Sequence, residues 1–218
     1  MRNQDGFDLW ADEYEASVGQ TERENRYPFA GYREVLGRIR SIVLTKPRAA
    51  VLDLGFGTGM LTAELYRRGC RIWGQDFSER MIALARKKMP DACLIKGDFS
   101  EGLAPPLRDL KFDFITATYS LHHLTDEQKE TFLPALRERL NEDGKLLIGD
   151  VAFRTEADRK KCRIEAGDEW DGEEYYFVAE VWKRIIPDMT FTPLSSCAGV
   201  FELPCRRPGK EEKPCMPI

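Results

Sequence analysis

The feature that most constrains this chain is a glycine-rich loop that follows an apolar run, Val51-Leu-Asp-Leu-Gly-Phe-Gly-Thr-Gly59. Gly55, Gly57 and Gly59 alternate with other residues in it. Glycine has no Cβ, so it lets backbone approach a ligand closely or adopt positive φ angles that other residues resist. The pattern predicts a strand that turns sharply into a ligand-binding loop. A tight strand-to-helix turn without a ligand would produce the same pattern.

The spacing of these glycines indicates which kind of ligand to expect. The dinucleotide fingerprint G-x-G-x-x-G requires glycine at position 60, where Met60 stands instead. In that fingerprint the helix N-terminus faces a pyrophosphate. The loop of this chain matches G-x-G-x-G, so we expect a nucleoside ligand without phosphates.

Two acidic residues close the next two apolar runs. Asp76 comes about 20 residues after the loop, where an acidic residue accepts hydrogen bonds from a ribose diol. Asp98, with Phe99 beside it, is suited to meet the amino group and ring face of an adenine, and Phe77 is a further candidate for cofactor contact. Each acid also has a simpler explanation: Asp76 as a charge favoured at a helix N-terminus, and Asp98 as part of a turn.

Asp53 lies within the first apolar run, two residues before the glycine loop. Its carboxylate could contact the amino group of the ligand. It could equally brace the loop by accepting backbone N–H hydrogen bonds. Both roles stay open at the level of the sequence.

The glycine loop and the two acids resemble, in order and separation, those of the class I S-adenosylmethionine-dependent methyltransferases. The resemblance covers roughly residues 5–155 and includes a fourth strand with its following loop at 112–124 and a fifth strand at 141–148. The chain is most similar to small stand-alone bacterial methyltransferases, which also begin with a pattern like Trp10 to Tyr14. The resemblance implies S-adenosylmethionine as the cofactor and Gly55, Gly57, Gly59, Asp53, Asp76, Phe77, Asp98, Phe99 and Tyr119 as its contacts.

His122 and His123 are the only histidines of the chain and fall in the loop that faces the methyl group in the related enzymes. Histidine can act as a general base near neutral pH, although either ring could simply pack or bond backbone. Adjacent histidines without a carboxylate or cysteine at ligand spacing do not define a coordination set, so we expect no metal ion.

Two tyrosines are candidates for positions near the sulfonium group. Tyr14, with Trp10, could form a lid whose aromatic faces attract the cation, or could anchor an amino-terminal helix on the core. Tyr119 is expected near the methyl donor, and a packing role is equally open. The predicted catalytic residues are therefore Tyr14, His122 and His123.

The class of methyl acceptor is narrowed mainly by a motif that this sequence lacks. Methyltransferases that modify amino groups of nucleic acids carry an Asp/Asn-Pro-Pro-Tyr/Phe loop after the fourth strand, and this chain has Thr118-Tyr-Ser-Leu there. A net charge of −4 also argues against a broad surface for nucleic-acid phosphates. We expect a small-molecule acceptor, with residues 7–32 and 153–187 as pocket walls. The alternatives are a non-catalytic cofactor-binding regulator and a nicotinamide-dependent oxidoreductase.

Length and periodicity predict one α/β domain over residues 1–203, followed by a flexible tail at 204–218. The parts are an amino-terminal helical cap at about 5–45, a cofactor-binding core at about 46–152 and a carboxyl-terminal part at about 153–203. Alternating strands and helices predict a Rossmann-like, doubly wound, mostly parallel seven-stranded sheet whose last strand is antiparallel. The strands are expected at about 50–54, 71–75, 92–96, 112–117 and 145–150, and in a hairpin at 190–203, with helices at about 32–43, 59–68, 78–88 and 126–140.

The remaining features are those of an ordinary cytoplasmic protein. Hydrophobic residues make up 42% of the chain, and no apolar run approaches the ~20 residues of a membrane span. The amino terminus lacks the pattern of a secretory signal, so a cytoplasmic location is expected. The six cysteines lack metal-ligand spacing and are interpreted as free thiols. The oligomeric state stays open.

Overall fold

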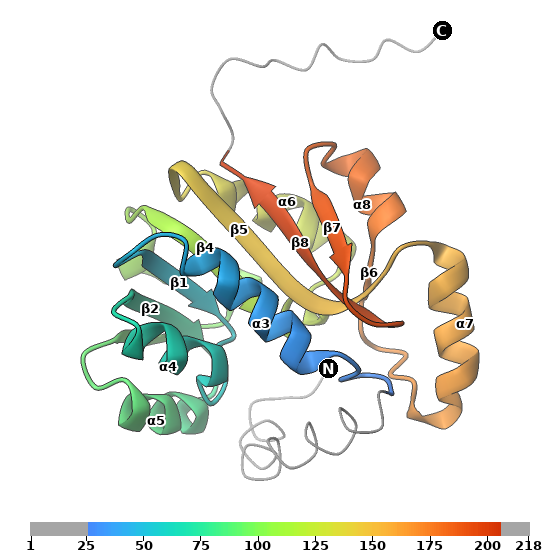
Figure 1. Cartoon of the computed structure of the whole chain (residues 1–218), viewed down its shortest axis with the longest axis horizontal. Helices are drawn as coiled ribbons and strands as arrows, with labels where there is room; N and C mark the ends of the chain where they lie inside the picture. The colour runs from blue at the N-terminus through green and yellow to red at the C-terminus, as the bar shows by residue number, and fades with distance from the viewer. Residues whose placement is uncertain (1–25, 206–218) are drawn as a thin grey trace, which may run out of the picture.

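The computed structural model describes residues 26–205, which form a mixed sheet with helices on both faces (Figure 1). Seven strands follow one another in the order β3-β2-β1-β4-β5-β8-β7, and the short β6 pairs with β5. The strands are β1 (Ala50–Leu54), β2 (Arg71–Asp76), β3 (Cys93–Lys96), β4 (Phe112–Thr118), β5 (Leu140–Phe153), β6 (Phe177–Val178), β7 (Thr190–Pro193) and β8 (Ala198–Pro204).

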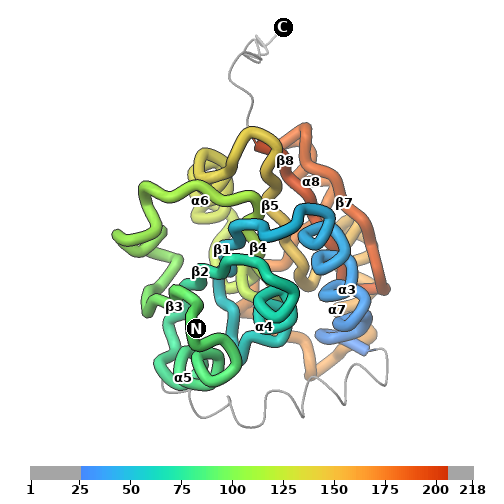
Figure 2. Tube along the Cα trace, turned by 60° about the vertical axis from the view of Figure 1, so that its left-hand side comes forward, coloured from blue at the N-terminus to red at the C-terminus, as the bar shows by residue number. Residues whose placement is uncertain are grey.

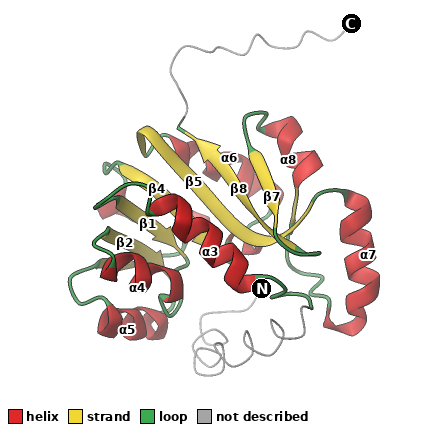
Figure 3. Ribbon diagram, in the orientation of Figure 1, coloured by secondary structure: helices red, strands yellow, loops and turns green. Residues whose placement is uncertain are grey.

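Parallel pairing dominates the sheet (Figure 3). Strand β1 pairs in parallel with β2 and β4, and β4 pairs in parallel with β5. Strand β8 runs antiparallel to both of its neighbours, β5 and β7. The expected Rossmann-like sheet with an antiparallel last strand is thereby confirmed, and β6 is an addition to the seven strands that the sequence predicted.

Helices cover the two faces of the sheet and create two apolar cores (Figures 1 and 2). All five residues of β1 are buried, as expected of a central strand covered on both sides. Helices α3, α4 and α5 pack on one face, and α6 and α8 pack on the other. The helices are α3 (Tyr32–Val43), α4 (Met60–Arg67), α5 (Glu79–Lys88), α6 (Asp126–Arg137), α7 (Glu156–Ala166) and α8 (Ala179–Ile185), with 3₁₀ turns η1 (Phe99–Glu101), η2 (Pro105–Leu107), η3 (Leu121–His123) and η4 (Gly167–Glu169).

Side-chain caps explain where two predicted helices begin. The hydroxyl of Ser78 accepts a hydrogen bond from Met81 N at 3.2 Å and starts α5. Thr125 and Gln128 form a capping box at the start of α6. Thr155 starts α7 with a second capping box.

The largest difference from the predicted elements lies between α6 and β5. The helix ends at Arg137 instead of about residue 140, and the strand begins at Leu140 instead of about residue 145. Leu140 pairs with Phe112, and the register then shifts before Phe114 pairs with Lys145. This early pairing draws polar residues 141–144 into the strand, which their composition does not suggest.

The structure describes only part of each end of the chain. Helix α3 is the described part of the expected amino-terminal cap, because residues 1–25 lie outside the described range. Strand β8 ends at Pro204, and Cys205 N still donates to Gly144 O at 3.0 Å. Among residues 26–205, none of the helices is both long and apolar enough to cross a membrane.

Candidate active site

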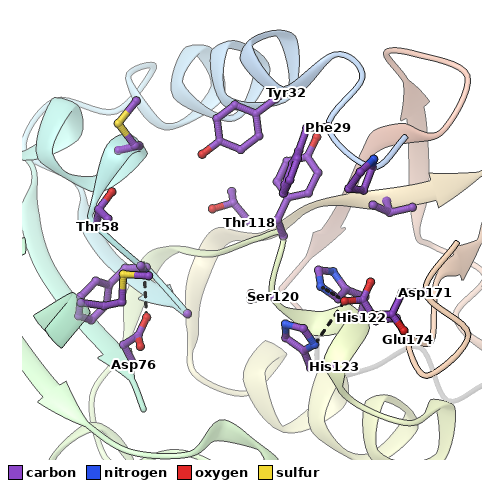
Figure 4. A pocket seen from close by; sticks show the side chains of 18 of the residues that line it. Phe29, Tyr32, Thr58, Asp76, Thr118, Ser120, His122, His123, Asp171 and Glu174 are labelled. Carbon is purple, nitrogen blue, oxygen red and sulfur yellow. Dashed lines mark hydrogen bonds and ion pairs between the residues drawn. The ribbon is translucent and has the colours of Figure 1, made fainter. Parts of the chain in front are cut away.

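A cavity of about 300 Å³ opens at the carboxyl ends of the central strands β1, β2 and β4 (Figure 4). The loop between β1 and α4 and the end of β2 line one side. Residues after β4 and a segment before β6 line the opposite side, and residues 27–32 supply a third wall. Parts of both segments expected to form pocket walls therefore meet here. In open α/β sheets this edge is where ligands bind.

Two of the three predicted loop glycines line this cavity. Gly55, Gly57 and Gly59 all have positive φ angles, of 66°, 54° and 77°. A Cβ on Gly55 would lie 2.6 Å from the Cβ of Ser120, which leaves no room for another residue. Gly59 is not part of the cavity wall, and a Cβ there would lie 3.0 Å from the end of the Met89 side chain. The turn into α4 and this packing account for the third glycine.

Asp76 lies at the end of β2 and contributes to the cavity wall (Figure 4). One carboxylate oxygen accepts a hydrogen bond from Gly57 N at 2.8 Å, and the other accepts one from Ser78 N at 3.0 Å. The side chain therefore joins the glycine loop to the start of α5. The helix-terminal role and the position at the ligand-binding edge, which the sequence presented as alternatives, coexist in one residue.

Asp53 lies behind the loop and does not line the cavity. Its carboxylate accepts hydrogen bonds from the hydroxyls of Thr62 and Thr116, the second at 2.9 Å. Burial raises the pKa of Asp53 to about 6, although the two hydroxyl hydrogen bonds lower it in part. The structure thus shows Asp53 braced by two side-chain hydroxyls instead of by loop N–H groups, because its strand position directs the side chain into the packing between β1, β4 and α4.

Asp98 is exposed and also lies outside the cavity wall. Its carboxylate accepts a hydrogen bond from Ser100 N at 2.8 Å and begins the 3₁₀ turn η1. This is the turn that the sequence left open as the simpler explanation. The neighbouring Phe99 is buried and lines the cavity, as does Phe77 after β2.

Tyr119 follows β4 with a positive φ of 50°, which is rare for a residue other than glycine. Its N–H donates to Gly149 O at 2.8 Å, and its ring lies 5.0 Å from that of Tyr32 and 5.5 Å from that of Phe29. All three rings line the cavity. Phe29 and Tyr32 were not singled out from the sequence, although both fall in the segment 7–32 that was expected to form a pocket wall.

His122 is held by a buried carboxylate that the sequence interpretation missed. The imidazole Nδ1 lies 2.6 Å from Asp150 Oδ1, and the backbone N–H of His122 donates to the other oxygen at 3.2 Å. Burial lowers the pKa of His122, but the negative charges of Asp150 and Glu174 outweigh it, so the pKa lies above its ordinary value. Asp150 could have been found only by noticing an acid within the buried run of β5.

Glu174 approaches both histidines from the segment before β6 (Figure 4). Its Oε1 lies 3.5 Å from His122 Nε2 and 3.9 Å from His123 Nδ1. Its Oε2 accepts a hydrogen bond from the Tyr176 hydroxyl at 2.7 Å. We expected no metal ion because the sequence has no carboxylate at ligand spacing from the histidine pair. The fold nevertheless supplies one, because it brings Glu174 to both histidines from a segment about 50 residues further along the chain.

The side of the cavity next to the histidines is strongly acidic. Four carboxylate residues of one short segment line it: Glu169, Asp171, Glu173 and Glu174. Among residues 26–205, neither lysine nor arginine contributes to the wall. Tyr14 and Trp10, the predicted lid residues, lie outside the described residues.

Known proteins share both the sequence and the fold. Residues 51–144 match a family model described as a methyltransferase domain. The chain is 34% identical over 208 residues to an uncharacterized methyltransferase of Geobacillus sp. (strain WCH70), covering 90% of this chain and 94% of the relative. It is 33% identical over 197 residues to one from Geobacillus thermodenitrificans (strain NG80-2), covering 86% and 88%.

Solved structures show the same architecture. A DhpI–SAH complex aligns with a TM-score of 0.67 and 21% identity over 94% of this chain and 96% of the other. Magnesium protoporphyrin IX methyltransferase from Synechocystis PCC 6803 with bound SAH aligns with a TM-score of 0.62 and 17% identity over 89% and 97%. The fold and the sequence relatives together define a class I S-adenosylmethionine-dependent methyltransferase. The chain belongs to the bacterial methyltransferase family of the two Geobacillus proteins.

Proposed function

We propose that this enzyme transfers the methyl group of S-adenosylmethionine to a small-molecule acceptor that binds in the same cavity. The observation that carries the proposal is the continuity of one cavity between two unlike ends. The glycine loop and Asp76 form one end, and His122, His123 and Glu174 form the other. Donor and acceptor bound at these ends would meet in the middle, beside Tyr119.

The donor end has the groups that a nucleoside requires. Gly55 and Gly57 bring backbone close to the cavity, and the Asp76 carboxylate would accept hydrogen bonds from the ribose hydroxyls. Phe77 and Phe99 offer apolar surface for the adenine ring. Asp53 supports this end from behind through Thr62 and Thr116, so its part in cofactor binding would be indirect.

The reaction would be an in-line displacement at the methyl carbon. A nitrogen, oxygen, sulfur or carbon atom of the acceptor attacks the methyl carbon, the bond between that carbon and the sulfonium sulfur breaks, and S-adenosylhomocysteine (SAH) leaves as a neutral thioether. Holding the reacting atoms in line near attack distance supplies several kcal/mol of the barrier. A general base is needed only when the nucleophile must lose a proton early. His122 and His123 would accordingly bind and orient the acceptor, with Tyr14 as the third predicted catalytic residue.

The size and charge of the cavity support a small acceptor. Its volume of about 300 Å³ lies at the lower end of the range for small-molecule sites, about 300–1,000 Å³. The acidic wall at residues 169–174 would repel the phosphates of a nucleic acid, which proteins normally neutralise with lysine and arginine. The two alternatives, a nicotinamide-dependent oxidoreductase and a non-catalytic regulator, lose their basis because the chain belongs to a methyltransferase family.

Calorimetry followed by a turnover assay tests the proposal. The purified protein is titrated with S-adenosylmethionine, SAH and NAD in one buffer, and micromolar binding of the first two alone is expected. A panel of small molecules is then screened for SAH release. Binding of NAD alone, or of none of the three compounds, would overturn the proposal. SAH release only with a nucleic acid or protein would overturn the acceptor class.

A further inference from the structure

We propose that His122, His123 and Glu174 bind a divalent transition-metal ion at the acceptor end of the cavity. One ligand atom from each residue lies within 4.8 Å of the other two. The Glu174 oxygen is 3.5 Å from His122 Nε2 and 3.9 Å from His123 Nδ1. Figure 4 shows the three side chains converging from two different segments of the chain.

The two separations that involve Glu174 are close to those that a metal ion requires. Nitrogen and oxygen ligands bind Zn²⁺ at about 2.0–2.2 Å with tetrahedral geometry, which places ligand atoms about 3.3–3.5 Å apart. The contacts of Glu174 with the two imidazoles are at this spacing or a few tenths of an ångström longer. Small rotations of the half-buried His123 and Glu174 side chains would close that difference. Three protein ligands also leave a coordination position open toward the cavity.

The first ligand is oriented by a partner behind it. His122 Nδ1 lies 2.6 Å from the fully buried Asp150 carboxylate, so Nε2 is the nitrogen that faces Glu174. Asp150 also accepts hydrogen bonds from the backbone N–H groups of His122 and Val151, at 3.2 and 2.8 Å. A carboxylate behind a histidine ligand is the arrangement that fixes ring orientation and strengthens the ligand in metal sites.

Glu174 is held in position by a second set of contacts. The Tyr176 hydroxyl donates to Glu174 Oε2 at 2.7 Å, which leaves Oε1 directed at the histidines. Tyr175 N donates to His122 O at 2.8 Å, so the backbone next to Glu174 is joined to the turn that carries both imidazoles. The buried ammonium of Lys129 donates to Tyr175 O on the same segment. The ligand set is therefore preorganised by groups that are not ligands themselves.

The ligand types indicate which ions would bind. Two imidazoles and one carboxylate suit zinc, iron, cobalt and nickel, whereas magnesium and calcium prefer oxygen ligands throughout. A catalytic role for the bound metal ion rests on the proposed methyl transfer. A hydroxyl or thiol of the acceptor bound at the open position would lose its proton to solvent more readily. The resulting anion would attack the methyl carbon, and SAH would leave.

Metal titration of the whole protein, without an affinity tag and after treatment with a chelator, tests the proposal directly. We expect one equivalent of Zn²⁺ or Co²⁺ per chain to bind with micromolar or tighter affinity, and Co²⁺ to show visible d–d absorption bands. Thiolate-to-cobalt charge-transfer bands should be missing. Their presence would assign the ion to the cysteines of the chain and overturn the proposal.

Variants identify the ligands. Glu174→Gln and His123→Ala should each weaken Co²⁺ binding at least about tenfold, and Asp150→Asn should weaken it about 10–100-fold, as for partners behind a ligand. Glu173→Gln is the matched control, because Glu173 lines the same cavity one residue away without belonging to the ligand set. Circular dichroism verifies that each variant is folded. If the variant of the buried Asp150 does not fold, His123→Ala and Glu174→Gln still test the metal site.

Two results would overturn the metal site. One is the lack of stoichiometric binding, and the other is binding that survives Glu174→Gln or falls equally in Glu173→Gln. Titration with SAH in the same samples separates this proposal from the proposed function. SAH binding without metal binding would remove only the metal site, whereas metal binding without SAH binding would remove the donor site and leave the metal site standing.

Discussion

The carboxylate of Asp76 accepts a hydrogen bond from the backbone N–H of Gly57 at 2.8 Å. The two residues are 19 positions apart and belong to the two motifs that the sequence made most prominent. The bond ties the end of β2 to the glycine loop, so one side chain shapes the loop and also faces the cavity. Replacing Asp76 should therefore weaken donor binding in two ways, by removing its contact with the donor and by removing its hydrogen bond to the glycine loop.

Replacing Asp76 tests the proposed ribose contact. We expect Asp76→Ala to weaken S-adenosylmethionine binding at least about tenfold, or about 1.4 kcal/mol, by calorimetry. Asp76→Asn retains one carbonyl oxygen, which can still accept from Gly57 N, so it should lose less affinity than alanine. Unchanged affinity in Asp76→Ala would reject Asp76 as a ribose ligand.

Gly55 tests whether the loop conformation is required for binding. In Gly55→Ala the new Cβ would meet Ser120 at 2.6 Å, at a φ of 66° that disfavours alanine. We expect a loss of about 1–3 kcal/mol in unfolding free energy and a clear loss of donor affinity. Gly102→Ala is the control, because Gly102 has a φ of 97° but open space and lies outside the cavity wall. Gly102→Ala should lose some stability and no donor affinity. Equal losses of donor affinity in both variants would contradict the assignment of Gly55 to the donor site.

Asp53 makes stability depend on pH. Its folded pKa of about 6 is above the ordinary value of 3.8, so the folded protein holds this proton more tightly than the unfolded chain. The contribution of Asp53 to stability is thus fully present below pH 3.8 and is lost as pH rises through about 6. Asp53→Asn does not titrate and keeps a polar group for Thr62 and Thr116.

Relative to the unchanged protein, Asp53→Asn should therefore gain up to about 3 kcal/mol of stability between about pH 4 and pH 7.5. Urea unfolding at several pH values measures this difference. Glu130→Gln is the control variant. Because Glu130 is exposed, little pH-dependent gain in stability is expected from this change. A stability difference that is independent of pH would show that folding does not raise the pKa of Asp53.

The predicted catalytic residues should affect turnover more than donor binding. We expect His123→Ala, and also Tyr14→Phe, to lower kcat by a larger factor than they weaken S-adenosylmethionine affinity. The reason is that contacts with the acceptor act on the reacting geometry and leave the donor end intact. Steady-state kinetics and calorimetry on the same samples compare the two quantities. Equal losses would assign these residues to donor binding or to folding.

Much of the fold is readable from local patterns. The apolar run before Gly55 predicts a buried central strand, and β1 is buried throughout. Thr125 and Gln128 mark the start of α6, because a capping box is made by residues three positions apart. The boundary between α6 and β5 was placed less well, because pairing of Leu140 with Phe112 depends on a strand that is distant in the sequence.

The sequence by itself indicated the order of the main strands and helices, the class of enzyme and the glycine loop and Asp76 that line the cavity, because glycines and strand-end acids act through local backbone geometry. Only the tertiary structure decided the side-chain surroundings. In the folded protein the side chain of Asp53 lies in the packing behind the loop, and Asp98 lies at the surface. The tertiary structure also brought Asp150 and Glu174 to the histidines from β5 and from the segment before β6. Contacts between distant segments depend on how the whole sheet and its helices pack, and no spacing along the chain encodes them.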